Sequence, residues 1–253
     1  MAASWFCGVT TAPRLDCTLA RCCESLRLAD LEPTVFSEPG STPTNCHTIR
    51  NSIRLGLWHN WLASCRFALQ SNPDFILTVQ DDSFFHPESR EFIESIDWPR
   101  HAGFVSLYTP KHYTVGGRGK LRPCGINRIR TKALWGACAL VWRPEILQSV
   151  ITHKIAESWA GARPRSGDLS VLDRRRKNPE TIANSDTAIG KICNALGLGM
   201  YFVDPSPVAH IARHSTIGHG SNSGRRNAYR IADHSLPLFF QIFGSTLDEQ
   251  ASV

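Results

Sequence analysis

Residues 75–82 read Phe-Ile-Leu-Thr-Val-Gln-Asp-Asp, an apolar run that passes directly into two carboxylates. An apolar run of this length and composition, residues 75–79, indicates a buried strand. In open α/β sheets, ligands bind outside the carboxyl ends of the strands, where Asp81 and Asp82 would lie. Adjacent carboxylates repel each other, and a hard divalent cation such as Mn²⁺ or Mg²⁺ relieves that repulsion. The alternative is an ordinary exposed turn that carries two acids.

Outward from this stretch, strand-like and helix-like segments alternate along the chain. Ile49, Ile53, Leu57 and Trp61 recur every four residues, which predicts one long amphipathic helix over residues 49–69. Further strands are expected over 5–9, 34–36, 104–108 and 200–203, and further helices over 19–29, from Pro144 onward and over 187–196. Alternation of this kind predicts an α/β fold with a mostly parallel central sheet and helices on both faces. We expect one domain over residues 1–253, with 218–253 as a C-terminal extension.

Composition favours a globular protein of ordinary type. The chain has 253 residues, of which 42% are hydrophobic and 20% charged. No run approaches the roughly 18 apolar residues that read as a membrane span, and the first residues lack a basic segment typical of a signal peptide. The nine cysteines form no CxxC pair and most have apolar neighbours, which favours reduced, buried thiols. We therefore expect a cytoplasmic protein with no membrane partner.

The formal net charge of +6 is concentrated in two stretches. Residues 111–134 hold seven basic side chains and no acidic one, and residues 174–177 read Arg-Arg-Arg-Lys. Such stretches can attract a diphosphate, nucleic acid or an acidic glycan. A solvated loop is the alternative, and the charge pattern leaves both open.

Four segments, taken in order, resemble the GT-A (Rossmann-like) glycosyltransferases. They are Gly8-Val-Thr-Thr-Ala-Pro-Arg14, Val35-Phe-Ser-Glu-Pro-Gly40, Gln80-Asp81-Asp82 and Pro205-Ser-Pro-Val-Ala-His-Ile211. The third is similar to the acidic metal motif of that family in a QDD form. The last resembles a Pro-Ser-Leu-x-Gln-His-Ile-Gly stretch near the end of some members, although Pro207 and Ala209 depart from that pattern. The order of the segments, over residues 5–219, is more specific than any one of them.

The resemblance implies a set of site residues. Asp82 and His210 would bind Mn²⁺ or Mg²⁺, although a lone histidine is more often a core or capping residue. Asp186 would be the base that accepts the proton of the acceptor hydroxyl, although Ser-Asp before an apolar run is also an ordinary helix N-cap. The residues expected to bind the donor are Thr10, Thr11, Ala12, Arg14, Phe36, Glu38, Gln80, Asp81, Trp135, Gly136 and Ala137.

These features together predict a metal-dependent glycosyltransferase. It would move a sugar from a nucleotide-sugar, a UDP-sugar by resemblance, to an acceptor hydroxyl, with inversion if Asp186 is the base. The acceptor candidates are a glycan and DNA that carries a hydroxylated base, the latter because of the basic stretches. Two alternatives remain: a nucleotidyltransferase of related fold, which would normally show a Gly-rich phosphate loop after the first strand, and a non-catalytic nucleic-acid-binding protein, which would leave Asp81 and Asp82 unexplained.

Overall fold

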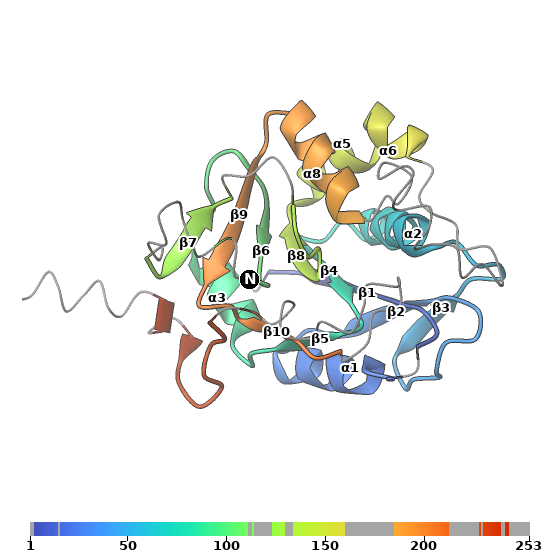
Figure 1. Ribbon diagram of the computed structural model, residues 1–253, viewed down its shortest axis with the longest axis horizontal. Helices are drawn as coiled ribbons and strands as arrows, with labels where there is room; N and C mark the ends of the chain where they lie inside the picture. Colours follow the sequence, from blue (N-terminus) through green and yellow to red (C-terminus); the bar gives the residue numbers. More distant parts are fainter. Residues whose placement is uncertain are drawn as a thin grey trace, which may run out of the picture.

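One eight-stranded sheet forms the centre of the protein, in the computed structural model shown in Figure 1. The structure describes residues 3–14, 16–110, 113, 123–129, 134–159, 185–212, 228, 230–238 and 241–242. The strands of the sheet are β1 (Trp5–Thr11), β2 (Pro33–Ser37), β3 (His47–Arg50), β4 (Phe75–Gln80), β6 (Ala102–Ser106), β7 (Gly125–Arg128), β8 (Ala139–Trp142) and β9 (Gly199–Asp204). Their spatial order is β3-β2-β1-β4-β8-β6-β9-β7.

The direction of the strands determines which residues meet at the sheet's edge. β3, β2, β1 and β4 pair in parallel, and so do β6 and β9. β8 lies between β4 and β6 and is antiparallel to both, with Val79 opposite Ala139. The start of β8 therefore lies beside the end of β4. This arrangement confirms the expected α/β fold with a large, mostly parallel sheet.

Helices cover both faces of the sheet (Figure 1). On one face lie α2 (Leu57–Gln70), α5 (Pro144–Ile151), α6 (Lys154–Ser158) and α8 (Ser185–Ala195). On the other lie α1 (Leu19–Leu28), α3 (Ser89–Ser95) and a small antiparallel sheet of β5 (Ser83–Phe85) and β10 (Val208–His210). No described helix is long and apolar enough to cross a membrane.

The two covered faces explain why β4 is apolar at successive positions. Leu77 and Val79 point into the core beneath α1 and α3, whereas Ile76 points into the core beneath α2, α5 and α8. All three side chains are at most 2% exposed. A strand buried on both faces needs a continuous apolar run rather than alternation, and this is the pattern of residues 75–79.

The expected helix over residues 49–69 is wrong in its first half. Ile49 belongs to β3, where it lies opposite Phe36, and α2 begins only at Leu57. Pairing with β2 provides backbone hydrogen bonds that a four-residue periodicity cannot reveal. Gly56, with a φ of 79°, separates the extended segment from the helix. The apolar spacing of Ile49 and Ile53 was therefore coincidental.

Replacing Leu77 by alanine should lower the free energy of unfolding by about 2–5 kcal/mol, because it leaves a cavity in the fully buried core between the sheet and α1. Leu28→Ala is the matched control, since Leu28 is 64% exposed and its loss should change stability by less than about 0.5 kcal/mol. Urea unfolding of both variants measures the difference. Equal effects would show that Leu77 is not the core residue described.

Candidate functional site

Two adjacent carboxylates lie buried at the carboxyl edge of β4. Asp81 is 1% exposed and Asp82 is 7% exposed. The Arg14 guanidinium, in the loop after β1, bridges them: one nitrogen pairs with Asp81, and Nη1 lies 3.0 Å from Oδ2 of Asp82. The hydroxyl of Thr11 donates to Oδ2 of Asp81 at 2.5 Å. The two carboxylates are therefore buried and paired at the expected edge of the sheet and do not form an exposed turn.

His210 reaches the same carboxylates from the far end of the chain. It lies in β10, opposite Ser83 of β5, and the next amide, of Ile211, donates to the backbone oxygen of Asp82 at 2.8 Å. This pairing places Nε2 of His210 at 3.1 Å from Oδ2 of Asp82, with the imidazole side chain 7% exposed. The structure thus brings Arg14, Asp82 and His210 together from three separate segments.

The two carboxylates differ in how readily they hold a proton. Burial raises the pKa of Asp81 to about 7, against the opposing positive charge of Arg14. Burial acts in the same direction on Asp82, but hydrogen bonds and charges of His210 and Arg14 outweigh it and hold the pKa of Asp82 below its ordinary value. The surrounding groups therefore favour the ionised form of Asp82.

Cys138 completes a group that sequence reasoning missed. Ligand atoms of Asp82, Cys138 and His210 lie within 4.8 Å of one another, which makes oxygen, sulfur and nitrogen donors available at one point. Oδ1 of Asp82 is buried and has no hydrogen-bond partner in the structure. A buried polar atom left unpaired is costly, and a cation that binds there would remove the cost. The residues present therefore fit a divalent metal.

Asp186 lies in the first turn of α8 and binds the two residues that precede Cys138. Its Oδ2 accepts the backbone N–H of Gly136 at 2.7 Å, and its Oδ1 accepts that of Ala137 at 3.2 Å. Burial raises the pKa of the Asp186 carboxyl, against the lowering effect of these backbone hydrogen bonds. The carboxylate is thus oriented by the peptide that leads to Cys138, and its pKa is shifted toward neutrality.

Gly136 is required by its surroundings. Its φ of +76° lies in the left-handed region, and a Cβ built on it would lie 2.7 Å from Cε1 of Tyr108. Tyr108 is buried, and its ring centroid is 6.3 Å from that of His210. Tyr113 fixes the preceding residue: its hydroxyl accepts the N–H of Trp135 at 2.6 Å and donates to the carbonyl of Trp135 at 3.2 Å.

The remaining residues expected to bind the donor surround this site at different depths. Thr10 is buried and donates to the carbonyl of Val79 at 3.1 Å, and Oε1 of Gln80 lies 3.9 Å from the Cys138 sulfur. Ala12 is partly exposed in the loop between β1 and Arg14. Trp135, 55% exposed, presents its indole to solvent beside Gly136.

Phe36 and Glu38 make contacts of a structural kind. The Phe36 ring is 1% exposed and packs against the rings of Phe6 and Phe67. The Glu38 carboxylate accepts the backbone N–H groups of residues 55 and 56, with a shortest distance of 2.9 Å, and so satisfies donors at the start of α2. The structure does not bring either side chain to the Asp81–Asp82 cluster.

Several features of the sequence lie outside the described residues. They include residues 174–177, most of 111–134, and residues 213–227. Only Tyr113, 123–129 and Leu134 of the first basic stretch are described, and Tyr113 and Leu134 both adjoin Trp135.

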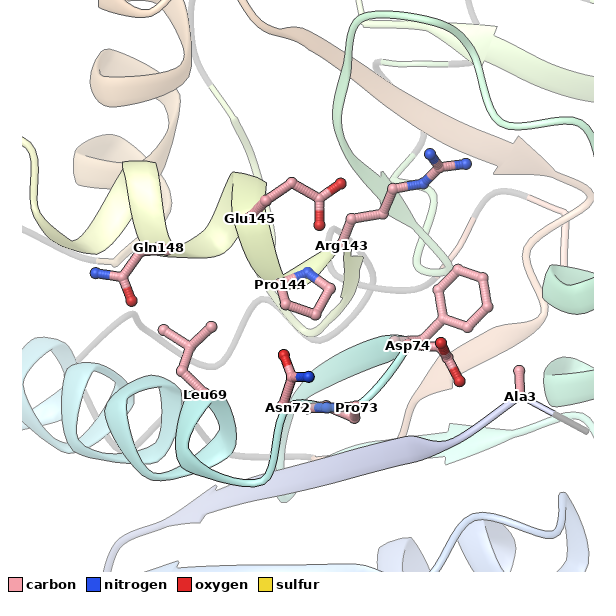
Figure 2. Close-up of a pocket in the computed structure, with 10 residues that line it drawn as sticks. Ala3, Leu69, Asn72, Pro73, Asp74, Arg143, Pro144, Glu145 and Gln148 are labelled. Carbon is pink, nitrogen blue, oxygen red and sulfur yellow. The ribbon is translucent and has the colours of Figure 1, made fainter.

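A broad open hollow of about 890 Å³ lies at the opposite edge of the sheet (Figure 2). It is lined by the start of β4 and the start of α5, and none of the expected site residues borders it. Asp74 accepts hydrogen bonds from the Ser4 backbone and hydroxyl, and Arg143 lies over the Trp98 ring. In Figure 2 the side chains of Arg143, Glu145 and Gln148 do not converge on one point. The hollow therefore lacks the features of the Asp81–Asp82 site.

Comparison with solved structures supports the fold. Staphylococcus aureus TarS matches with a TM-score of 0.50 at 13% identity, over 83% of this chain and 37% of TarS. A nucleotidyl transferase from Methanothermobacter, Mth528, matches with a TM-score of 0.46 at 11% identity, over 80% of this chain and 88% of that one. No protein-family model and no curated protein matches the sequence. At these identities the likeness to TarS shows the architecture alone.

Gly136→Ala should destabilise the protein by about 1–2 kcal/mol for the left-handed backbone and by about 1–3 kcal/mol more for the overlap with Tyr108. Gly197→Ala is the matched control, because Gly197 has a similar φ of +69° and nothing within 4 Å of its built Cβ. The difference between the two free energies of unfolding isolates the effect of the Tyr108 ring. Identical values would mean that the ring does not constrain this peptide.

Proposed function

We propose that the protein is a metal-dependent glycosyltransferase that uses a nucleotide-sugar donor. The observation that carries the proposal is the convergence of Arg14, Asp82 and His210 at the carboxyl edge of β4, with one buried oxygen of Asp82 unpaired. A nucleotidyltransferase would share the sheet and the acidic pair, but residues 10–14, Thr-Thr-Ala-Pro-Arg, contain none of the glycines of a phosphate-binding loop. Glycosyl transfer is therefore the better fit.

Each residue has a distinct task in this proposal. Asp82 and His210 hold the cation, which when bound neutralises charge on the departing nucleoside diphosphate. Arg14 holds both carboxylates through its two terminal nitrogens, and we propose that its guanidinium exchanges one of these contacts for an oxygen of the diphosphate when the donor binds. Trp135 offers an exposed flat face beside Gly136 for the sugar or the acceptor. The nucleobase of the donor in this proposal is uracil, and it rests on the family resemblance alone.

Asp186 is the proposed general base. Oδ1 accepts both the Ala137 N–H and, at 3.3 Å, the Ser185 hydroxyl, whereas Oδ2 accepts the Gly136 N–H and is the oxygen proposed to take the proton. Burial raises the pKa of this carboxyl above its ordinary value, which suits a general base. A base that removes the acceptor proton while the diphosphate leaves from the opposite face of the sugar gives inversion at the anomeric carbon. We therefore propose an inverting reaction.

The first test follows release of nucleoside diphosphate from UDP-, GDP- and TDP-sugars with Mn²⁺ or Mg²⁺ and with excess chelator. Asp82→Asn should lower the rate at least about a hundredfold, because it removes the ionised oxygen that holds the cation. Asp97→Asn, which changes an exposed acid outside the site, is the control and should retain full activity. Circular dichroism of both variants verifies folding. Undiminished release in chelator and in Asp82→Asn would refute the metal mechanism.

The acceptor in this proposal is anionic. Two described residues of the stretch 111–134 lie beside the site: Tyr113 bonds to Trp135, and Leu134 precedes Trp135 in the chain. Its seven basic side chains are suited to a polymer with repeated negative charge, and DNA with a hydroxylated base is the proposed example. Transfer to a base within a duplex would also require that the base leave the stack.

Duplex DNA should bind the protein at low salt and lose affinity steeply as salt rises, because binding releases condensed counterions. Fluorescence anisotropy measures the slope of log affinity against log salt. Changing Arg118, Lys120 and Arg122 together to alanine should reduce that slope by about 2–3, at about 0.9 for each phosphate that is no longer neutralised. Changing Lys154 and Lys191, which lie on α6 and α8, to alanine is the control. Absence of binding at low salt would redirect the search to acidic glycans.

A further inference from the structure

A thiol lies where the proposed cation would bind, and none of the expected ligands accounts for it. Cys138 opens the segment that leads into β8, and because β8 is antiparallel to β4, this residue lies beside the end of β4. The carbonyl of Cys138 accepts the N–H of Gln80 at 2.8 Å and the hydroxyl of Ser83 at 3.1 Å. Its backbone is thus held on both sides of Asp81 and Asp82.

We propose that Cys138 is the third protein ligand of the cation, with Asp82 and His210, and that its thiolate makes the site prefer Co²⁺ and Zn²⁺ over Mg²⁺. This inference rests on the cation site of the proposed function and adds the ligand that determines which metal it takes. The three ligand atoms lie within 4.8 Å of one another. Asp82 follows β4, Cys138 immediately precedes β8 and His210 ends β10, so strand pairing brings the three residues together.

The second observation is the unpaired oxygen of Asp82. Oδ2 already contacts Arg14 and His210, whereas Oδ1 is buried with no partner, in a residue that is 7% exposed. Among the buried polar atoms of the described residues that lack a partner, Oδ1 of Asp82 is the one carboxylate oxygen, and the ion pair with Arg14 does not satisfy it. A cation on Oδ1 satisfies it and leaves the contacts of Arg14 with Asp81 and with Oδ2 of Asp82 in place.

Charge and ligand chemistry then favour the thiolate. The Arg14 guanidinium neutralises part of the carboxylates' charge, so an ion at Oδ1 gains from a further anionic ligand. On binding, Cys138 loses its proton to solvent and its sulfur forms the bond to the metal. Mg²⁺ requires oxygen ligands in near-octahedral geometry, whereas imidazole and thiolate suit softer divalent ions. The oxygen, nitrogen and sulfur set therefore disfavours Mg²⁺.

Cobalt substitution tests the ligand directly. Co²⁺ titrated into the full chain, with and without UDP, should give near-ultraviolet thiolate-to-cobalt charge-transfer absorption. In Cys138→Ser that absorption should vanish and Co²⁺ affinity should fall at least about tenfold, while Mg²⁺ affinity should stay the same or rise. Cys193→Ser is the matched control: Cys193 is also buried, but it lies against Gly103 at the opposite edge of the sheet. It should leave both the spectrum and the affinity unchanged.

If Cys138→Ser does not fold, X-ray absorption of the zinc-loaded wild-type chain tests the same ligand. It should show one sulfur atom at about 2.3 Å from the zinc. Stoichiometric metal binding without a charge-transfer band or a sulfur scatterer would overturn the role of Cys138 and leave the Asp82–His210 site intact. If wild type and Asp82→Asn both fail to bind any of these ions, the cation of the proposed function fails with it.

Discussion

The burial of two adjacent carboxylates at the tip of a central strand is the constraint on which the site depends. An ionised carboxylate away from water is stable only if other groups compensate its charge, and removing one partner of a buried ion pair costs about 3–5 kcal/mol. Arg14 supplies that compensation to both Asp81 and Asp82, and His210 supplies more to Asp82. The loop after β1 and the strand β10 are therefore tied to β4 electrostatically as well as by packing.

The expected strands were recovered where the sequence carries a local signal. Residues 75–79 are apolar at nearly every position because both faces of β4 are covered, and such a run is legible without a structure. Asp81 and Asp82 directly follow β4, and Arg14 lies three residues after β1, so the expectation that they share an edge needed only a parallel sheet. His210 was found by resemblance, since its place depends on the pairing of β10 with β5, which joins residues over a hundred positions apart.

What the sequence could not reveal depends on strand order. Cys138 has apolar neighbours, and a cysteine in such surroundings is normally a buried core residue. It becomes a candidate ligand only because β8 lies antiparallel between β4 and β6, a fact that no local pattern encodes. The helix predicted from residue 49 was wrong at its start for the same reason. Strand β3 exists through its pairing with β2, and the Glu38 carboxylate accepts a backbone N–H before α2 from a residue 17 positions away.

The peptide from Gly136 to Cys138 joins the two halves of the site. Asp186 binds the amides of Gly136 and Ala137, and the next residue reaches the Asp82–His210 cluster. The Tyr108 ring lies against Gly136, and its centroid is 6.3 Å from that of His210, so a single aromatic side chain limits the space available to both. The separation between the proposed base and the proposed cation is then set by three residues of backbone. For a reaction in which the acceptor must approach opposite a departing diphosphate, such a short, rigid link is the physical means of holding the two groups in register.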